Sequence, residues 1–423
     1  MKVFKFGGAS VKDAAAVRNV AEIISLFKGD KIGVVVSAMG KTTNALELIV
    51  DALYNRKKSN FDELVAERKD FHIEIISELF TNKNHSIFSE ITTEFEQLSN
   101  MYNARIPDNY NYEYDQIVSL GEVISTKIVS AYLNECNIPS AWADARLLIR
   151  TNNKYREGEV DWNKTEGLFK ENFLPEFENC DVQVVQGFIG HTSEGLTTTL
   201  GREGSDYTAG IMAFCCDAES VTIWKDVPGM LNADPKWFDN TIKLNSISFH
   251  EAIELSYYGA SVIHPKTLKP LQNKNIPLYV KSFIEPHASG TVIQSSTSED
   301  HLIPSFIFKM NQVLFSFTPK DFSFIVEKNL SDIFSRLATA DAKINLMQNS
   351  ALNFSILLDE EKVNIEEIQN LFEDTYKVRY NQGLELVTVR HYDQETLDRV
   401  TTDKDIILQQ KTRETARLIV KQK

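Results

Sequence analysis

The chain opens with two short apolar segments separated by one amphipathic segment, and this pattern constrains the fold more than any other. Val3–Phe6 ends at Gly7-Gly8, and Ile32–Val36 is an apolar run without polar alternation. Such a run is typical of a parallel strand that is buried on both faces. Between the two runs, apolar side chains recur at helical spacing at Val17, Val20, Ala21 and Ile24. A strand–helix–strand unit of this kind predicts an α/β fold.

Later segments continue the pattern up to about residue 295. Val182–Val185 and Val221–Trp224 are predicted as further buried strands, and Pro277–Val280 as a late strand. Residues 45–105 are polar and helical in pattern, and we interpret them as a helical insertion. The polar stretch 294–300 has no periodicity and predicts a linker. We therefore expect one domain over residues 1–295 and a second region over 301–423.

The second region has a different order of elements. Its apolar segments predict strand, helix, two strands, helix and strand between residues 312 and 380, which is a ferredoxin-like α+β unit. Leu384–Val389 and Ala416–Val420 are predicted as strands on either side of a long polar stretch. These last residues look too short for a second complete unit, so a second module is expected to be abbreviated.

Composition excludes several classes of protein. A length of 423 residues favours two or three domains. The formal net charge of −14 argues against a nucleic-acid-binding protein. The four cysteines have no metal-binding spacing, which predicts reduced thiols and no metal ligands. No apolar run reaches the roughly 18 residues that cross a bilayer, and no signal-peptide pattern opens the chain, so a cytoplasmic protein without membrane contact is expected.

Two segments that follow predicted strands suit an anionic ligand. In Lys5-Phe-Gly-Gly8, a cation at a strand end precedes glycines whose backbone N–H groups can approach a phosphate. A surface lysine before a turn is the alternative reading. Ser37 to Thr43 follows the next strand and offers hydroxyl groups, or simply a capping turn.

Two more segments combine glycine with charge. In Thr197 to Asp206, Arg202 can hold a carboxylate, while Asp206 could be only a helix N-cap. The stretch Ile223 to Gly229, with Lys236 a few residues later, is either a binding loop or a surface loop.

Together, these motifs resemble the aspartokinases of the amino acid kinase family. The signatures K-F-G-G, T-T-L-G-R-x-G-S-D and W-x-D-V-P-G occur in the family's order. Ser119–Glu122, Arg150–Asn152, Gln186–Ile189 and Gly259–Pro265 extend the resemblance. It implies a three-layer αβα kinase domain followed by an ACT regulatory region. The implied enzyme is monofunctional and converts ATP and L-aspartate to ADP and 4-phospho-L-aspartate, the first step toward lysine, threonine and methionine. It also implies a homodimer and an amino-acid effector.

The resemblance also implies roles for individual residues. Lys5 and Asp206 would be catalytic. The residues that would bind the substrate are Ser37, Thr43, Glu122, Arg202, Glu203, Gly204 and Ser205. The residues that would bind ATP are Lys5, Phe6, Gly7, Gly8, Lys225, Asp226 and Lys236. Mg²⁺ would be carried by the nucleotide, without a dedicated metal ligand from the protein. A carboxylate nucleophile is already ionised at pH 7, so no general base is required.

Several positions depart from the family pattern. Ala9 stands where the family usually has Thr near the phosphate loop, and Glu203 stands where Gly is common. Ser261 stands where many members have a Lys that reaches the nucleotide. Asn345 and Ala351 stand where lysine-inhibited relatives carry acidic residues, so inhibition by lysine is expected to be weak or absent. His264 is interpreted as structural.

Two other readings remain open at this level. One is a related kinase that acts on glutamate or an N-acylated amino acid. The other is a non-catalytic amino-acid sensor that keeps the fold.

Overall fold

The computed structural model describes residues 1–104, 106–260 and 263–423. These residues form two compact units. Unit 1 comprises Met1–Met230, Lys243–Ile253 and Val262–Glu299. Unit 2 comprises Leu231–Ile242, Glu254–Ser261 and Asp300–Lys423. The sequence predicted a single boundary near residue 295. It did not predict that two earlier segments, Leu231–Ile242 and Glu254–Ser261, belong to unit 2.

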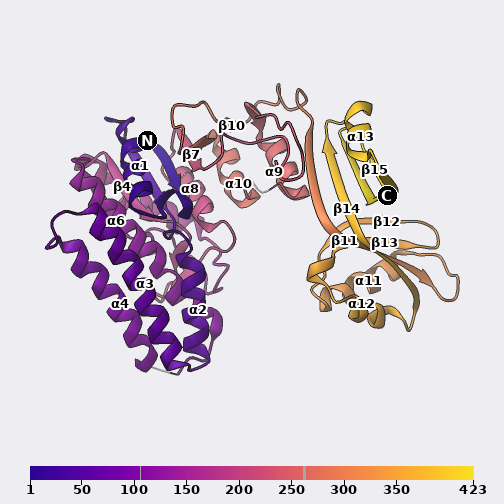
Figure 1. The fold of residues 1–423 in the computed structure, drawn as a ribbon, viewed down its shortest axis with the longest axis horizontal. Helices are drawn as coiled ribbons and strands as arrows, with labels where there is room; N and C mark the ends of the chain where they lie inside the picture. Colours follow the sequence, from indigo (N-terminus) through magenta and orange to yellow (C-terminus); the bar gives the residue numbers. More distant parts are fainter. Residues whose placement is uncertain (105, 261–262) are drawn as a thin grey trace. The chain divides into compact units, whose positions relative to one another are not determined.

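Unit 1 is built on an eight-stranded sheet, shown with its helices in Figure 1. The strand order is β3-β4-β2-β1-β7-β9-β10-β8, and every neighbouring pair is parallel except β9 with β10. The strands are β1 (Lys2–Phe6), β2 (Ile32–Val36), β3 (Ser140–Ala143), β4 (Val182–Gln186), β7 (Ser220–Lys225), β8 (Ser246–Ser248), β9 (Leu278–Ser282) and β10 (Thr291–Gln294). This arrangement confirms the predicted α/β class with its mostly parallel sheet.

Helices and one hairpin complete this part of the chain. The helices are α1 (Ala14–Ser25), α2 (Thr42–Tyr54), α3 (Lys58–Leu79), α4 (Ser86–Ala104), α5 (Tyr110–Val118), α6 (Leu120–Glu135), α7 (Trp162–Asn172), α8 (Gly204–Cys215), α9 (Phe249–Tyr258) and α10 (Pro265–Lys274). The boundary between the two units falls within α9. β5 (Ile189–His191) and β6 (Thr197–Thr199) form a separate antiparallel hairpin.

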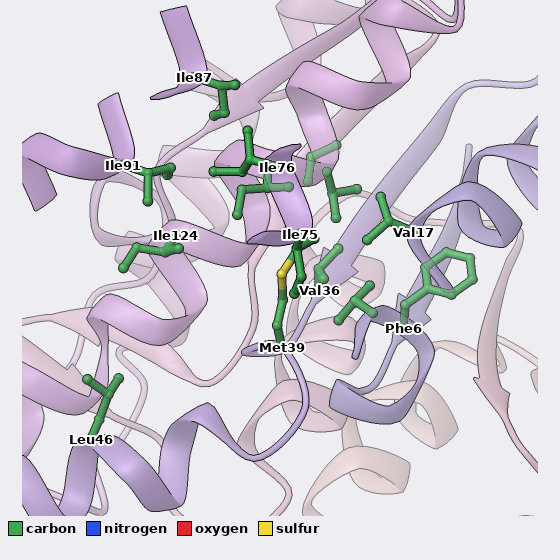
Figure 2. Packing of buried hydrophobic residues seen from close by; sticks show 14 of the residues in the cluster. Phe6, Val17, Val36, Met39, Leu46, Ile75, Ile76, Ile87, Ile91 and Ile124 are labelled. Carbon is green, nitrogen blue, oxygen red and sulfur yellow. The ribbon is translucent and has the colours of Figure 1, made fainter. Parts of the chain in front are cut away.

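The helical insertion shares its hydrophobic core with the sheet. Side chains from β1, β2, α1, α2, α3, α4 and α6 form one buried cluster (Figure 2). Phe6 and Val36 lie at its sheet end, and Ile87 and Ile91 come from α4. Because side chains alternate along a strand, the neighbouring Lys5 faces the other side of β1, which α8 covers. The sheet is therefore the middle of three layers.

The main part of unit 2 is a six-stranded antiparallel sheet with three helices, in the strand order β12-β13-β11-β14-β16-β15. Its elements are β11 (Ser305–Pro319), α11 (Glu327–Thr339), β12 (Ile344–Asn349), β13 (Phe354–Asp359), α12 (Ile365–Phe372), β14 (Tyr376–Arg390), α13 (Gln394–Thr401), β15 (Lys404–Lys411) and β16 (Thr415–Gln422). The first part of this order agrees with the predicted ferredoxin-like unit.

Two sequence expectations for this region were wrong. Residues 376–380 and 384–389 form one continuous strand, β14, and not two. The polar stretch that follows contains α13 and β15. Helix α13 buries only Leu397 and Val400, and exposed or half-buried residues dominate β15, so neither element carries a strong apolar pattern. Residues 384–423 thus supply one described helix, where a complete ferredoxin-like unit has two.

Candidate active site

A cavity of about 1040 Å³ lies where several parallel strands of unit 1 end. The carboxyl ends of β1, β2, β4 and β7 meet at this edge of the sheet, which is where open α/β sheets bind ligands. Ten of the predicted site residues line the cavity: Lys5, Ser37, Thr43, Glu122, Arg202, Glu203, Gly204, Ser205, Asp206 and Lys225. The structure therefore brings together residues from segments that are distant in sequence.

Lys5 and Asp206 form a buried ion pair in this cavity. The Nζ atom of Lys5 lies 2.6 Å from Oδ1 of Asp206, and both side chains are almost fully buried. Lys225, at the end of β7, places its Nζ atom 3.8 Å from Oδ2 of the same carboxylate. Asp206 lies in the first turn of α8, whose N-cap is Glu203, so it is not the N-cap residue. Two ammonium groups around one carboxylate leave positive charge for an anionic ligand.

Glu122 supplies a buried carboxyl group to the same cavity. It lies in the first turn of α6 and is only 2% exposed. The backbone N–H of Ala38 donates to Oε1 over 3.3 Å, whereas Oε2 is buried and has no hydrogen-bond partner among the described residues. Burial raises the pKa of Glu122 to about 8. A buried, unsatisfied acceptor of this kind suits a cationic group of a ligand.

Gly121 explains how Glu122 reaches this position. A Cβ atom on Gly121 would lie 3.0 Å from Cβ of Ala38 and 3.1 Å from Cδ1 of Leu46. The start of α6 therefore packs closely against the turn that follows β2. This contact holds the Glu122 carboxyl group beside the Ala38 backbone.

The turn before α8 is also set by close packing. A Cβ atom on Gly187 would lie 2.5 Å from Cβ of Ser205, and one on Gly204 would lie 2.5 Å from the ring of Phe188. These glycines let the start of α8 approach the end of β4. Arg202 is exposed in the turn and makes no hydrogen bond or ion pair with another described residue. It is therefore available to a carboxylate ligand.

Glu203 has a structural contact in addition to its place in the cavity wall. Its backbone is left-handed, with φ of +54°, and its Oε2 atom accepts a hydrogen bond of 2.9 Å from the backbone N–H of His264. The Nδ1 atom of His264 in turn accepts from the backbone N–H of Lys266 at the start of α10. This capping contact agrees with the structural reading of His264.

Five predicted nucleotide-binding residues do not line the cavity: Phe6, Gly7, Gly8, Asp226 and Lys236. The Phe6 side chain is buried in the core and stacks on Trp224, so only its backbone is available to a nucleotide. A Cβ atom on Gly8 would lie 2.8 Å from the Ala38 carbonyl oxygen, which makes Gly8 a packing residue. Lys236 belongs to unit 2. Ser261 lies outside the described residues.

Part of the cavity wall consists of residues that the sequence analysis did not predict. Asn109, Asn111 and Tyr114 come from the start of α5, and residues 154–157 form a loop that packs against this helix. Asn109 is the N-cap of α5, since its side chain accepts from the backbone N–H of Tyr112. An N-cap search before residue 110 could have found this helix. No comparable signal marks the loop at Arg156.

Among the described residues, no group of three or more His, Cys, Asp or Glu side chains gathers in a way that could hold a metal ion. None of the helices formed by these residues is both long enough and apolar enough to span a membrane.

Comparison with known proteins identifies the family. The model of the amino acid kinase family matches residues 1–282. The chain therefore belongs to the amino acid kinase family.

The similar proteins place it more narrowly, among the aspartokinases of that family. The chain is 32% identical to lysine-sensitive aspartokinase 3 of Escherichia coli, over 84% of this chain and 78% of that protein. It is 31% identical to chloroplastic aspartokinase 1 of Arabidopsis thaliana, over 85% of this chain and 64% of that protein.

Solved structures agree with this placement. E. coli aspartokinase III in complex with lysine and aspartate has a TM-score of 0.84 and 27% identity, over 100% of this chain and 96% of that chain. The same enzyme in complex with aspartate and ADP has a TM-score of 0.76, again with 27% identity and the same coverage. These matches confirm the fold of both the kinase domain and the ACT-like region.

Proposed function

We propose that this chain is an aspartate kinase, which transfers the γ-phosphoryl group of ATP to the β-carboxylate of L-aspartate. One carboxylate oxygen forms a bond to phosphorus while the bond from phosphorus to the ADP oxygen breaks. No proton is transferred, because the attacking carboxylate is ionised at pH 7. The protein's task is to align two anions and to offset their charge.

The observation that carries this proposal is that one cavity contains both ammonium groups, which suit a phosphate, and a buried carboxyl group, which suits an ammonium group. The ammonium groups of Lys5 and Lys225 both lie within 4 Å of the Asp206 carboxylate. In the same cavity, Oε2 of Glu122 is buried without a hydrogen-bond partner among the described residues. The ammonium groups would stabilise the transferring phosphoryl group, and Glu122 would bind the α-ammonium of an amino acid. Arg202 would bind its α-carboxylate, and Ser37, Thr43 and Ser205 would orient the substrate.

Mg²⁺ would neutralise phosphate charge when it is bound with ATP. Asp206 is already paired with Lys5 and Lys225, so the ion would be held mainly by phosphate oxygens and water. Backbone N–H groups near Gly7 and Gly8, together with Asp226, remain the proposed nucleotide contacts within unit 1. We also infer a cytoplasmic homodimer in the pathway to lysine, threonine and methionine, with an amino-acid effector of the ACT-like region.

Substrate choice tests the proposal. The purified chain is incubated with ATP, Mg²⁺ and hydroxylamine, and acyl-hydroxamate formation is compared for L-aspartate, L-glutamate and N-acetyl-L-glutamate. We expect a product with L-aspartate at a kcat/KM at least tenfold above that for the other acids. A preference for glutamate or the N-acetyl acid would support the related kinase instead, and no product with any acid would support the sensor.

A further inference from the structure

Arg156 occupies an unusual backbone conformation in the cavity wall. It lines the cavity from the loop 154–157, and its φ of +66° lies in the left-handed region that normally favours glycine. A side chain held there costs conformational energy, which the surrounding contacts must offset. The loop therefore keeps an arginine at a position whose backbone geometry does not favour one.

Asp115 provides the contacts that hold this conformation. It is fully buried in α5, and its two carboxylate oxygens accept hydrogen bonds of 2.9 and 3.1 Å from the backbone N–H of Arg156. The same carboxylate accepts 3.0 and 2.8 Å bonds from the backbone N–H and the Oγ1 atom of Thr199. One buried side chain thus joins the loop to the end of β6.

The guanidinium group of Arg156 is partly free to bind an anion. It lies over the ring of Tyr114, with 4.2 Å between Cζ and the ring centroid. A guanidinium that stacks on a ring keeps its edge N–H groups available for a carboxylate. Its nearest carboxylate, that of Glu47, is 3.7 Å away, and both side chains are about two-fifths exposed.

Two lysines of the wall are engaged more closely than Arg156. Lys5 is paired with Asp206 at 2.6 Å, and Lys154 is paired with Glu157 at 2.9 Å. Arg202 and Arg156 are the arginines that line the cavity, and a guanidinium group can bind a ligand carboxylate through two N–H groups.

The backbones at Arg156 and Arg202 are close. A Cβ atom on Gly201, the residue before Arg202, would lie 3.3 Å from the carbonyl oxygen of Arg156. The backbone N–H of Gly158 donates to the carbonyl oxygen of Thr199 on β6 over 2.8 Å. The loop and the turn that carry the two arginines therefore form one continuous wall.

We propose that Arg156 is a specificity-determining residue that binds the α-carboxylate of the amino-acid substrate together with Arg202, and that Asp115 positions it. This inference rests on the proposed function, which supplies the acidic amino acid. It adds a second guanidinium to the carboxylate site, presented from a different segment of the chain.

The test compares substrates that differ at the α-carboxylate. Arg156→Gly removes the guanidinium and suits the left-handed backbone. We expect its KM for L-aspartate to rise about tenfold or more, with kcat changed less than threefold. The α-amide of L-aspartate keeps the β-carboxylate and the ammonium group but lacks the α-carboxylate. With this amide, the KM of the variant and of the wild type should agree within threefold. If turnover of the amide is too slow, its inhibition constant against L-aspartate replaces KM.

Arg56→Gly is a matched control. Arg56 also has a left-handed backbone, with φ of 55°, and its Cζ atom also lies 4.2 Å from the centroid of a tyrosine ring, that of Tyr102. It is absent from the cavity lining, so its loss should leave KM for L-aspartate within twofold of the wild-type value.

Asp115→Asn tests the positioning role. The amide side chain keeps the shape but has one acceptor oxygen in place of two, so it should raise KM for L-aspartate while kcat falls less. In the double variant with Arg156→Gly, the KM increase should be smaller than the product of the two single increases.

The outcomes separate the two proposals. A wild-type chain that does not phosphorylate L-aspartate overturns the proposed function and this inference with it. An active wild type in which Arg156→Gly leaves KM for L-aspartate unchanged overturns this inference alone. This inference is also overturned if Arg156→Gly raises KM by the same factor for L-aspartate and for its α-amide.

Discussion

The ammonium group of Lys5 on β1 lies 2.6 Å from the carboxylate of Asp206 on α8, inside a cavity at the ends of parallel strands. Neither residue has its partner nearby in sequence. The pairing exists because β1 packs against α8, so the fold itself assembles the charged centre.

Replacement of Lys5 by alanine should remove most of the catalytic rate. If Lys5 stabilises the transferring phosphoryl group, kcat for Lys5→Ala should fall about 100-fold or more, because such stabilisation acts in the transition state. The hydroxamate assay measures this loss. Lys2→Ala removes a lysine from the other end of the same strand and should keep kcat within twofold. Comparable losses in the two variants would count against the assigned role.

Activity with L-aspartate should depend on the ionisation of Glu122. The pKa of about 8 means that the empty site holds a mostly protonated carboxyl group at pH 7. Only the ionised form pairs with the substrate ammonium group, so kcat/KM for L-aspartate should rise between pH 7 and about 9, with a midpoint near pH 8, and level off above that. Glu122→Gln should show a low kcat/KM without this rise. A wild-type profile that is flat across this range would contradict the assignment.

The same raised pKa affects stability with the opposite sign. Between pH 4.5 and about 8, the native protein keeps the Glu122 proton that the unfolded chain has lost, so stability falls as pH rises. Glu122→Gln removes this dependence. Its melting temperature without ligand should exceed that of the wild type at pH 8 by more than it does at pH 5.

His72 should make the kinase domain sensitive to acid. The side chain is fully buried in α3, and burial lowers its pKa to about 4. Between pH 6.5 and 4, the unfolded chain binds a proton that the native protein does not, so up to ~3 kcal/mol of stability is lost as the pH falls. Denaturant titrations of the wild type and His72→Phe at pH 7 and 5 test this. The variant should lose less stability over this interval, and equal losses would exclude His72 as the cause.

Alanine should have opposite effects on stability at Gly187 and Gly167, because the space around their Cβ positions differs. Gly187→Ala would place Cβ 2.5 Å from Cβ of Ser205, so we expect a destabilisation of about 1–3 kcal/mol and reduced activity. Gly167 lies in α7 with nothing within 4 Å of its Cβ position. Gly167→Ala should therefore stabilise the protein by about 0.5–1 kcal/mol. Thermal unfolding distinguishes them, and a loss of stability in both would show that the packing argument fails.

Lysine should inhibit this chain weakly or not at all. Asn345 is already occupied, since its Oδ1 atom accepts a 2.8 Å hydrogen bond from Nζ of Lys309 and its amide group donates to Gln312 and Asp359. Ala351 offers no side-chain acceptor. A kinase assay with increasing L-lysine checks this, with threonine and methionine as comparison effectors. Half-inhibition at micromolar lysine would refute the expectation.

The sequence predicted the centre of the site better than its wall. Lys5, Arg202 and Asp206 lie in glycine-containing motifs directly after strands or before a helix, and the strand order brings such positions to one edge. Arg156 could not be found in this way, because arginine does not normally adopt a left-handed backbone and Asp115 is distant in sequence. Tertiary hydrogen bonds determine that part of the site.

The same limit applies to the fold of unit 2. Buried apolar residues made β11, β13 and α12 visible in the sequence. β15 lies at the edge of its sheet and buries little, so the apolar pattern that indicates a strand is weak there.

The two long strands of unit 2 have a mechanical consequence. β11 and β14 pair along nearly their whole lengths. One half of the six-stranded sheet consists of β12 and β13 with the last part of β11 and the first part of β14, and the other half consists of β15 and β16 with the remaining parts of these two strands. Their pairing is interrupted by register shifts around Gln312, where Asn311 has a φ of +51°. The halves therefore cannot separate without breaking this shared ladder, and they should unfold as one cooperative block. Any distortion that begins in one half must reach the other as a change in the twist or bend of two common strands.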